Sequence, residues 1–141
     1  SEMTQTLLLH NDVSEVSLLA GWVEGIGEQL SLSPGDVFQL NLALEEAVVN
    51  VMHYAYPGET GRPVRLEMQS SENSEELVFV LEDDGIPFDP TLAEEPDVTL
   101  DATERPIGGL GIFLVSQIMK EVSYRRCDGK NILLMRYNLN K

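Results

Sequence analysis

Apolar positions in the first third of the chain form one strand-like run and then recur at helical spacing. Residues 4–10 are a short, mostly apolar run, which predicts a β-strand. Asn11 or Asp12 could cap a helix that follows and extends to about Leu30. The apolar face of this predicted helix holds Val16, Leu19, Trp22, Val23 and Ile26. Three glycines inside it weaken the helix by up to about 1 kcal/mol each relative to alanine.

The second predicted helix has a clear start and a clear end. Ser33 supplies a hydroxyl cap, Pro34 suits the first helical position, and Asp36 places negative charge at the positive end of the helix dipole. The helix is expected to end at about Ala55, because the next residues are Tyr56-Pro57-Gly58. Proline disfavours the α conformation in the residue before it, and glycine permits a turn. We therefore expect a helix from residue 34 to about residue 55.

Two β-hairpins are predicted in the rest of the chain. Residues 63–69 and 76–82 are strand-like and are separated by a short polar turn. Residues 123–127 and 131–139 flank Asp128-Gly129, a dipeptide typical of two-residue hairpin turns. Antiparallel hairpins are therefore expected to supply most of the sheet.

A long loop and a third helix are expected between the hairpins. Residues 84–107 are rich in Pro, Asp, Glu and Thr and show no period, and so long a loop in a small domain is usually functional or disordered. Residues 108–122 predict a helix with a buried stripe of Leu110, Leu114, Val115, Ile118 and Met119. The order of elements indicates an α+β fold, a two-layer α/β sandwich in which helices pack on one face of a mixed, mostly antiparallel sheet.

Composition narrows the class of protein. The 141 residues suit one domain, residues 1–141, and 43% apolar residues suffice for a sizeable core. No apolar stretch approaches the roughly 20 residues that span a bilayer, and one cysteine fits a reducing, cytoplasmic setting. A formal net charge of −15 would repel nucleic acid and anionic membranes, whereas a basic protein partner would be attracted. Simple solubility is an equally good explanation of the charge.

Polar residues interrupt the apolar second helix at Glu46 and Asn50. Residues four apart lie on one face of a helix, so these two side chains project together. A carboxylate and an amide oxygen so placed could hold Mg²⁺, or one could orient a nucleophile while the other binds the metal. Because acids on helices are mostly solvated, the pair alone is weak evidence.

Two further motifs suggest a ligand site. Asp83 and Gly85 follow a predicted strand, where a sharp turn would place a carboxylate that accepts hydrogen bonds from an exocyclic amine. Gly109 and Gly111 lie at the start of the third predicted helix, where free backbone N–H groups attract phosphate. A solvated acidic turn and close helix packing are the respective alternatives.

The order of these motifs resembles a known superfamily. The sequences EEAVVN, DDGIPFDP and GGLGIFLV are similar to those of the ATP-binding fold of gyrase, heat-shock-90 chaperones, sensor histidine kinases and mismatch-repair ATPases. Within this superfamily, the residues of the three motifs resemble those of the bacterial anti-sigma-factor serine/threonine kinases. The resemblance covers nearly the whole chain.

The resemblance implies roles for individual residues. Glu46 resembles the general base and Asn50 the Mg²⁺ ligand, while Asp83, with Gly85, resembles the acid that binds the adenine amino group. The remaining candidate nucleotide contacts are Gly109, Leu110, Gly111, Arg105 and Asn131. Residues from about 90 to 107 correspond to the lid over the nucleotide. Asn131 stands where the family commonly has a Gly-Thr-Thr-like step, and Tyr54 stands where it often has His.

The resemblance also implies cofactors and partners. It implies ATP with Mg²⁺, a small anti-anti-sigma antagonist as the phosphorylation substrate, a sigma factor as binding partner, and a homodimer. Two functions remain open at this point. The chain is either an ATP-dependent kinase that also binds a sigma factor, or a nucleotide-binding regulatory module without kinase activity.

Overall fold

The computed structural model describes residues 3–70, 75–92 and 109–139. Five strands form one sheet: β1 (Met3–His10), β2 (Pro63–Ser70), β3 (Glu76–Asp83), β4 (Glu121–Cys127) and β5 (Lys130–Asn138). The strand order is β1-β2-β3-β5-β4, and every neighbouring pair is antiparallel. The helices are α1 (Ser17–Leu30), α2 (Pro34–Tyr54) and α3 (Gly109–Ile118), with 3₁₀ turns at Val13–Val16 (η1) and Pro90–Leu92 (η2).

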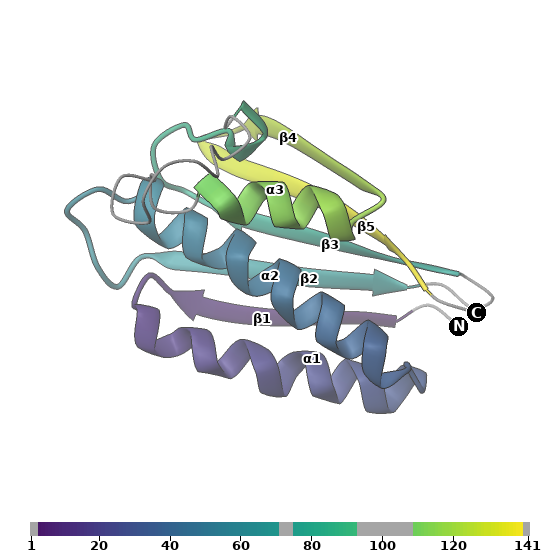
Figure 1. Ribbon diagram of the computed structural model, residues 1–141. Helices are drawn as coiled ribbons and strands as arrows, with labels where there is room; N and C mark the ends of the chain where they lie inside the picture. Colours follow the sequence, from purple (N-terminus) through teal and green to yellow (C-terminus); the bar gives the residue numbers. More distant parts are fainter. Residues whose placement is uncertain (1–2, 71–74, 93–108, 140–141) are drawn as a thin grey trace.

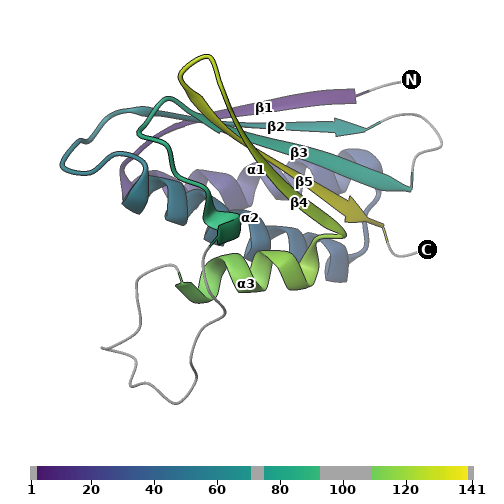
Figure 2. The ribbon, with the colours of Figure 1, turned by 90° about the horizontal axis from the view of Figure 1, so that it is seen from above.

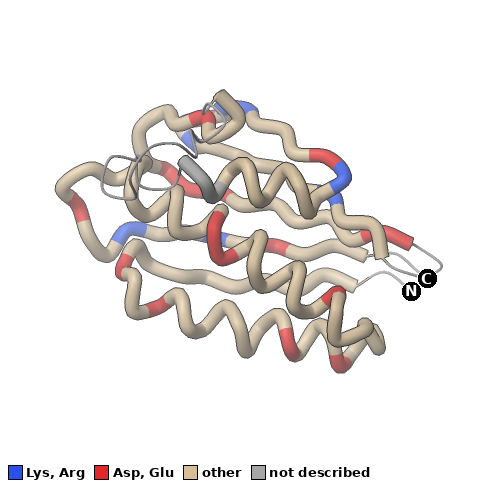
Figure 3. The backbone as a smooth tube through the Cα atoms, viewed as in Figure 1, with Lys and Arg blue, Asp and Glu red and all other residues tan. Residues whose placement is uncertain are grey.

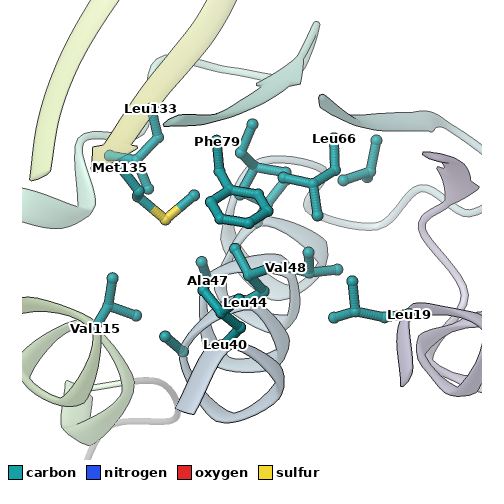
Figure 4. Packing of buried hydrophobic residues seen from close by; sticks show 14 of the residues in the cluster. Leu19, Leu40, Leu44, Ala47, Val48, Leu66, Phe79, Val115, Leu133 and Met135 are labelled. Atoms are coloured by element: carbon teal, nitrogen blue, oxygen red, sulfur yellow. The ribbon is translucent and has the colours of Figure 1, made fainter. Parts of the chain in front are cut away.

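The helices form one layer and the sheet forms the other. Figure 1 shows α2 lying between α1 and α3, and Figure 2 shows the three helices on the same side of the sheet. The inward residues of the central strands alternate with outward ones, so that Leu66, Phe79 and Met135 are fully buried. They pack against Leu44 and Val48 of α2 (Figure 4). The predicted α+β sandwich is confirmed, although the described sheet is antiparallel throughout rather than mixed.

The 3₁₀ turn η1 and the helix α2 each begin at a polar cap. The Asp12 side chain accepts a hydrogen bond from the Ser14 amide at 3.0 Å and begins η1, so the predicted first helix is divided into η1 and α1. The Ser33 hydroxyl accepts from the Asp36 amide at 3.0 Å, which confirms the predicted start of α2.

The third helix is shorter than predicted. It was expected to reach Val122, but α3 ends at Ile118 and β4 begins at Glu121. The reason is competition for the backbone, because the Lys120 amide donates to Arg136 of β5 and Glu121 pairs with the same residue. The buried stripe is therefore Ile112, Val115 and Met119, while Leu114 and Ile118 are only partly buried. The side chain of Leu110 lies outside the described part.

The second hairpin turns as predicted. Asp128 and Gly129 have φ angles of 51° and 75°. Two consecutive positive φ angles are typical of the mirror-image turn that matches the twist of paired strands. This tight turn fixes the register in which Arg126 faces Asn131 across the hairpin.

Charge is distributed unequally between the two layers. Figure 3 shows acidic positions but no basic ones along α1 and α2. On the strands, basic side chains pair with acidic ones, for example Arg136 with Glu121 at 2.7 Å and Lys130 with Glu82 at 3.3 Å. The charged residues of α1 and α2 are therefore all acidic, whereas charges of opposite sign pair on the strands.

Candidate functional site

The helix α2 presents Glu46 and Asn50 beside a fully apolar packing surface. Its buried residues Leu44, Ala47, Val48 and Val51 face the core, as the helical spacing predicts. Glu46 is partly buried, and Asn50 is only 3% exposed. The structure thus brings both residues to a flank of α2, the helix that packs against α3.

Asn50 has an unsatisfied hydrogen-bond donor. Its Nδ2 is buried and has no acceptor among the described residues. Leaving a buried polar group unpaired costs about 1–3 kcal/mol. A phosphate oxygen could accept from Nδ2, and an amide oxygen such as Oδ1 is a ligand type that Mg²⁺ takes. The residue therefore fits a site for Mg²⁺ and a nucleotide.

Asp83 ends β3 as a buried carboxylate. It is 3% exposed, and its Oδ1 accepts from the Gly85 amide at 2.9 Å and from Asn131 Nδ2 at 2.8 Å. Burial raises the pKa of Asp83 above its usual value, because a charged form is poorly solvated there, and these hydrogen bonds and the nearby Arg126 oppose the shift. The other oxygen, Oδ2, accepts no hydrogen bond from the described residues.

Gly85 is required by close packing. A Cβ atom at this position would overlap the Ala55 carbonyl oxygen and would lie 2.7 Å from the carbonyl carbon. The neighbouring Ile86 amide donates to the same oxygen at 2.8 Å. The expected role of Gly85 was to permit a sharp turn, but the physical reason is the close approach of the end of α2. Glycine thus lets the segment after β3 pack directly against α2.

An aromatic contact joins the same two regions. The Tyr54 ring lies 5.4 Å from the ring of Phe88, measured between centroids. Tyr54 is the position at which the family often has His, and here it packs against the segment that follows Asp83. The neighbouring His53 is exposed, and the described residues contain no group of three or more side chains that could hold a metal ion.

Asn131 makes four hydrogen bonds within the site. Its Nδ2 donates to Asp83 Oδ1 and to the Ile86 carbonyl oxygen, each at 2.8 Å. Its Oδ1 accepts from the Phe88 amide at 3.1 Å and from the Tyr124 hydroxyl at 2.6 Å. We call these five residues the Asn131 network. The amide expected to contact nucleotide is thus already engaged with the protein.

Several residues around Asp83 were not predicted to be site residues. Asp84 is exposed, but its Oδ1 lies 3.0 Å from Arg62 Nη2 and 2.9 Å from the Tyr56 hydroxyl. The Tyr56 hydrogen bond and Arg62 lower the pKa of Asp84. From β4, Arg126 donates a hydrogen bond to the Gly85 carbonyl oxygen at 2.8 Å. The alternation along β4 places Arg126 and Tyr124 on one face, and this was the available signal.

The phosphate end of the candidate site is only partly described. Gly109 and Gly111 lie in the first turn of α3, as predicted, so backbone N–H groups at this end lack helical partners. Arg105 and residues 93–107 of the expected lid lie outside the described residues, while residues 90–92 form η2.

A family model now identifies the class of protein. The model of the histidine kinase-like ATPase domain matches residues 9–137. The chain belongs to this family, as the order of the three motifs predicted. A family of ATPase domains implies that the chain has a site for ATP. Within the described residues, no helix is both long enough and apolar enough to cross a membrane.

Proteins similar in sequence to this chain include bacterial serine/threonine and serine protein kinases. The chain is 28% identical to the serine/threonine-protein kinase BtrW of Bordetella bronchiseptica, covering 96% of this chain and 94% of that protein. It is 29% identical to the serine-protein kinase RsbW of Listeria monocytogenes, covering 94% and 85% respectively. The likeness extends over nearly the full length of both proteins.

Solved structures confirm the fold. A structure of the RsbU and RsbW domains of a Mycobacterium tuberculosis protein matches with a TM-score of 0.69 at 9% identity. The match covers 99% of this chain and 33% of the other, so the chain corresponds to one third of that protein. A histidine kinase domain of Erythrobacter litoralis matches with a TM-score of 0.51 at 16% identity, covering 90% of this chain and 60% of the other.

Proposed function

We propose that this protein is an ATP-dependent serine/threonine protein kinase that acts as an anti-sigma factor. The observation that carries the proposal is the pairing of partly buried Glu46 with Asn50, whose buried Nδ2 has no acceptor among the described residues. The serine kinases to which the chain is similar support the same activity. The substrate would be a small anti-anti-sigma protein, and the second partner a sigma factor.

Each candidate residue has a definite task in this proposal. Asp83 binds the adenine amino group, because an ionised carboxylate is purely an acceptor. Asn50 holds Mg²⁺ and donates to a phosphate oxygen. When bound, Mg²⁺ neutralises developing negative charge on the phosphates. Glu46 accepts the proton of the attacking serine or threonine hydroxyl, while the terminal phosphoryl group passes from ATP to that oxygen and leaves ADP.

Two further groups complete the proposed site. The first turn of α3, with Gly109, Leu110 and Gly111, supplies backbone N–H groups to the phosphates. Arg105 contacts a phosphate, since a guanidinium binds phosphate oxygens bidentately. We also propose that the kinase acts in the cytoplasm as a homodimer. The acidic α1–α2 layer would accelerate encounter with a basic face of a partner.

Replacement of Glu46 tests the kinase activity directly. Purified protein is incubated with radiolabelled ATP, Mg²⁺ and an anti-anti-sigma domain, and label transfer is measured. We expect Glu46→Gln to lower the transfer rate by at least about 100-fold, because a general base contributes roughly 10²–10⁴-fold. ATP affinity should change little. The matched control is Glu45→Gln on the exposed neighbouring position of α2, which should transfer label at the wild-type rate.

The alternative function predicts a different result. If the protein is a nucleotide-binding regulatory module without kinase activity, the wild type binds ATP but transfers no label to any anti-anti-sigma domain tested. Full transfer by Glu46→Gln would show that this carboxylate is not the base. Absence of ATP binding in calorimetry, with and without Mg²⁺, would remove the basis for both functions.

A further inference from the structure

The segment from Asp83 to Phe88 is held by the hairpin formed by β4 and β5. Arg126 Nη1 donates to the Gly85 carbonyl oxygen, and Asn131 bonds to Asp83, Ile86 and Phe88. These two hairpin residues are opposite each other in the strand register. One hairpin therefore fixes both the side chain of Asp83 and the backbone that follows it.

The orientation of the Asn131 amide is determined by its partners. Asp83 Oδ1 and the Ile86 carbonyl oxygen are acceptors, so they require the Nδ2 side of the amide. The Phe88 N–H is a donor and requires Oδ1. A reversed amide would place oxygen against two oxygens and nitrogen against a donor. Asn131 can therefore satisfy all its neighbours in one orientation only.

Tyr124 completes this arrangement from β4. Its hydroxyl donates to Asn131 Oδ1 at 2.6 Å, and its ring is partly buried. The inward side chains of β4 and β5 lie on the same face, since Tyr124 is paired with Leu133 and Arg126 with Asn131. The hydroxyl thus restricts rotation of the amide that holds Asp83 Oδ1.

We propose that Asn131 and Tyr124 are positioning residues that set the base specificity of the site through Asp83. Together they hold Oδ1 in hydrogen bonds and present Oδ2 to the exocyclic amine of adenine. This inference rests on the proposed ATP site and goes beyond it. Guanine has a carbonyl oxygen where adenine has its amine, and a fixed carboxylate oxygen repels it. A mobile carboxylate would discriminate less between the two bases.

The test compares two tyrosines that each donate one hydroxyl hydrogen bond. Tyr124→Phe removes the bond to Asn131, and the control Tyr137→Phe removes the bond to buried Asp36 in the first turn of α2. Affinities for ATP and GTP are measured by calorimetry with Mg²⁺. Tyr124→Phe should weaken ATP binding roughly three- to tenfold and lower the ATP/GTP affinity ratio. Tyr137→Phe should leave the ratio at the wild-type value.

A second variant acts on the amide itself. Asn131→Asp keeps both acceptor contacts but removes the donors to Asp83 and Ile86 and adds a second carboxylate beside Asp83. We expect a larger loss of the ATP/GTP ratio than in Tyr124→Phe, and a pH profile of ATP binding displaced to higher pH. A purely structural role would change thermal stability but neither the ratio nor the profile.

The outcomes separate this inference from the proposed function. Wild-type discrimination retained in both Tyr124→Phe and Asn131→Asp, with ATP still bound, overturns the inference and leaves the proposed ATP site intact. Wild-type protein that binds neither nucleotide overturns both. A lowered ratio in Tyr124→Phe beside an unchanged ratio in Tyr137→Phe supports the inference even if Asn131→Asp fails to fold.

Discussion

The base-reading end and the phosphate end of the proposed site differ in how fully the protein satisfies its own polar groups. At the base-reading end, Asn131 makes four hydrogen bonds and Gly85 is packed against α2. At the phosphate end, Asn50 Nδ2 is buried with no acceptor among the described residues. The first region is preorganised, whereas the second has a donor that a bound ligand could satisfy.

This difference indicates how the site divides its tasks. Recognition of a base requires an acceptor fixed in position, so rigid support around Asp83 serves specificity. In the proposed kinase, transfer of a phosphoryl group requires interactions that form with the nucleotide and the metal, and an unpaired Asn50 Nδ2 in the protein without ligand fits that role at a cost in stability. Changes at the first end should therefore destabilise the protein, while changes at the second should affect binding and activity alone or even raise stability.

The largest effect is expected for Gly85→Ala. The added Cβ overlaps the Ala55 carbonyl oxygen, which belongs to the backbone and cannot rotate away. We expect the free energy of unfolding to fall by about 3 kcal/mol or more and ATP binding to be lost, because α2 and the segment after β3 must separate. Chemical denaturation and calorimetry measure the two effects.

The control for Gly85→Ala is Gly21→Ala on α1. A Cβ at Gly21 meets nothing within 4 Å, and the residue is exposed within a helix. Alanine there should raise the free energy of unfolding by up to about 1 kcal/mol and leave ATP binding unchanged. Equal stability of Gly85→Ala and wild type would contradict the close packing of the base-reading end.

A smaller change in stability, of the opposite sign, is expected for Asn50→Leu. Leucine is similar in size to asparagine and has no polar group, so the substitution removes a buried donor that lacks an acceptor among the described residues. The free energy of unfolding should therefore stay equal or rise by about 1–2 kcal/mol. Binding of ATP with Mg²⁺ should be abolished in the same protein. Thermal denaturation and calorimetry give the two readouts. A destabilised Asn50→Leu would mean that Asn50 has a structural role in the protein without ligand.

Periodicity predicted most of the fold, because burial of apolar faces determines both helices and strands. The caps at Asp12 and Ser33 and the Asp128-Gly129 turn are local signals, and the structure has all three. The predicted end of α3 lies four residues beyond the observed end at Ile118, since Met119 and Val122 are apolar residues compatible with either a helix or a strand. Pairing with β5, which is remote in sequence, ends the helix.

The candidate site was predictable only where a residue type carries its own signal. Asp83 and Asn50 stood out as polar residues within apolar patterns, and both are buried. Tyr124 and Arg126 gave no such signal. The Asp128-Gly129 turn predicts their strand register, but their roles depend on where the segment after β3 packs against this hairpin, which the sequence does not specify. The need for glycine at position 85 likewise depends on how closely the end of α2 approaches it.

The smallest expected effect is on the pH dependence of stability, to which the adjacent Asp83 and Asp84 should contribute in opposite directions. Burial raises the pKa of Asp83, so the native state binds its proton more tightly than the unfolded state, whose pKa is near 3.8. Its contribution to stability is complete below that value and is lost as pH rises through the native pKa. Asp84 behaves oppositely. Its pKa is lowered by the Tyr56 hydrogen bond and Arg62, so its contribution is present above 3.8 and is lost as pH falls through the native pKa.

Unfolding free energies of wild type, Asp83→Asn and Asp84→Asn between pH 3 and pH 7 test this opposition. The stability of Asp83→Asn relative to wild type should increase with pH, because asparagine keeps an acceptor for Gly85 and Asn131 but carries no buried charge. The relative stability of Asp84→Asn should decrease with pH, because the ion pair with Arg62 is absent. Slopes of the same sign in both variants would show that Asp83 is solvated in the native protein, and the base-reading end would then lack the buried, fixed acceptor on which its specificity depends.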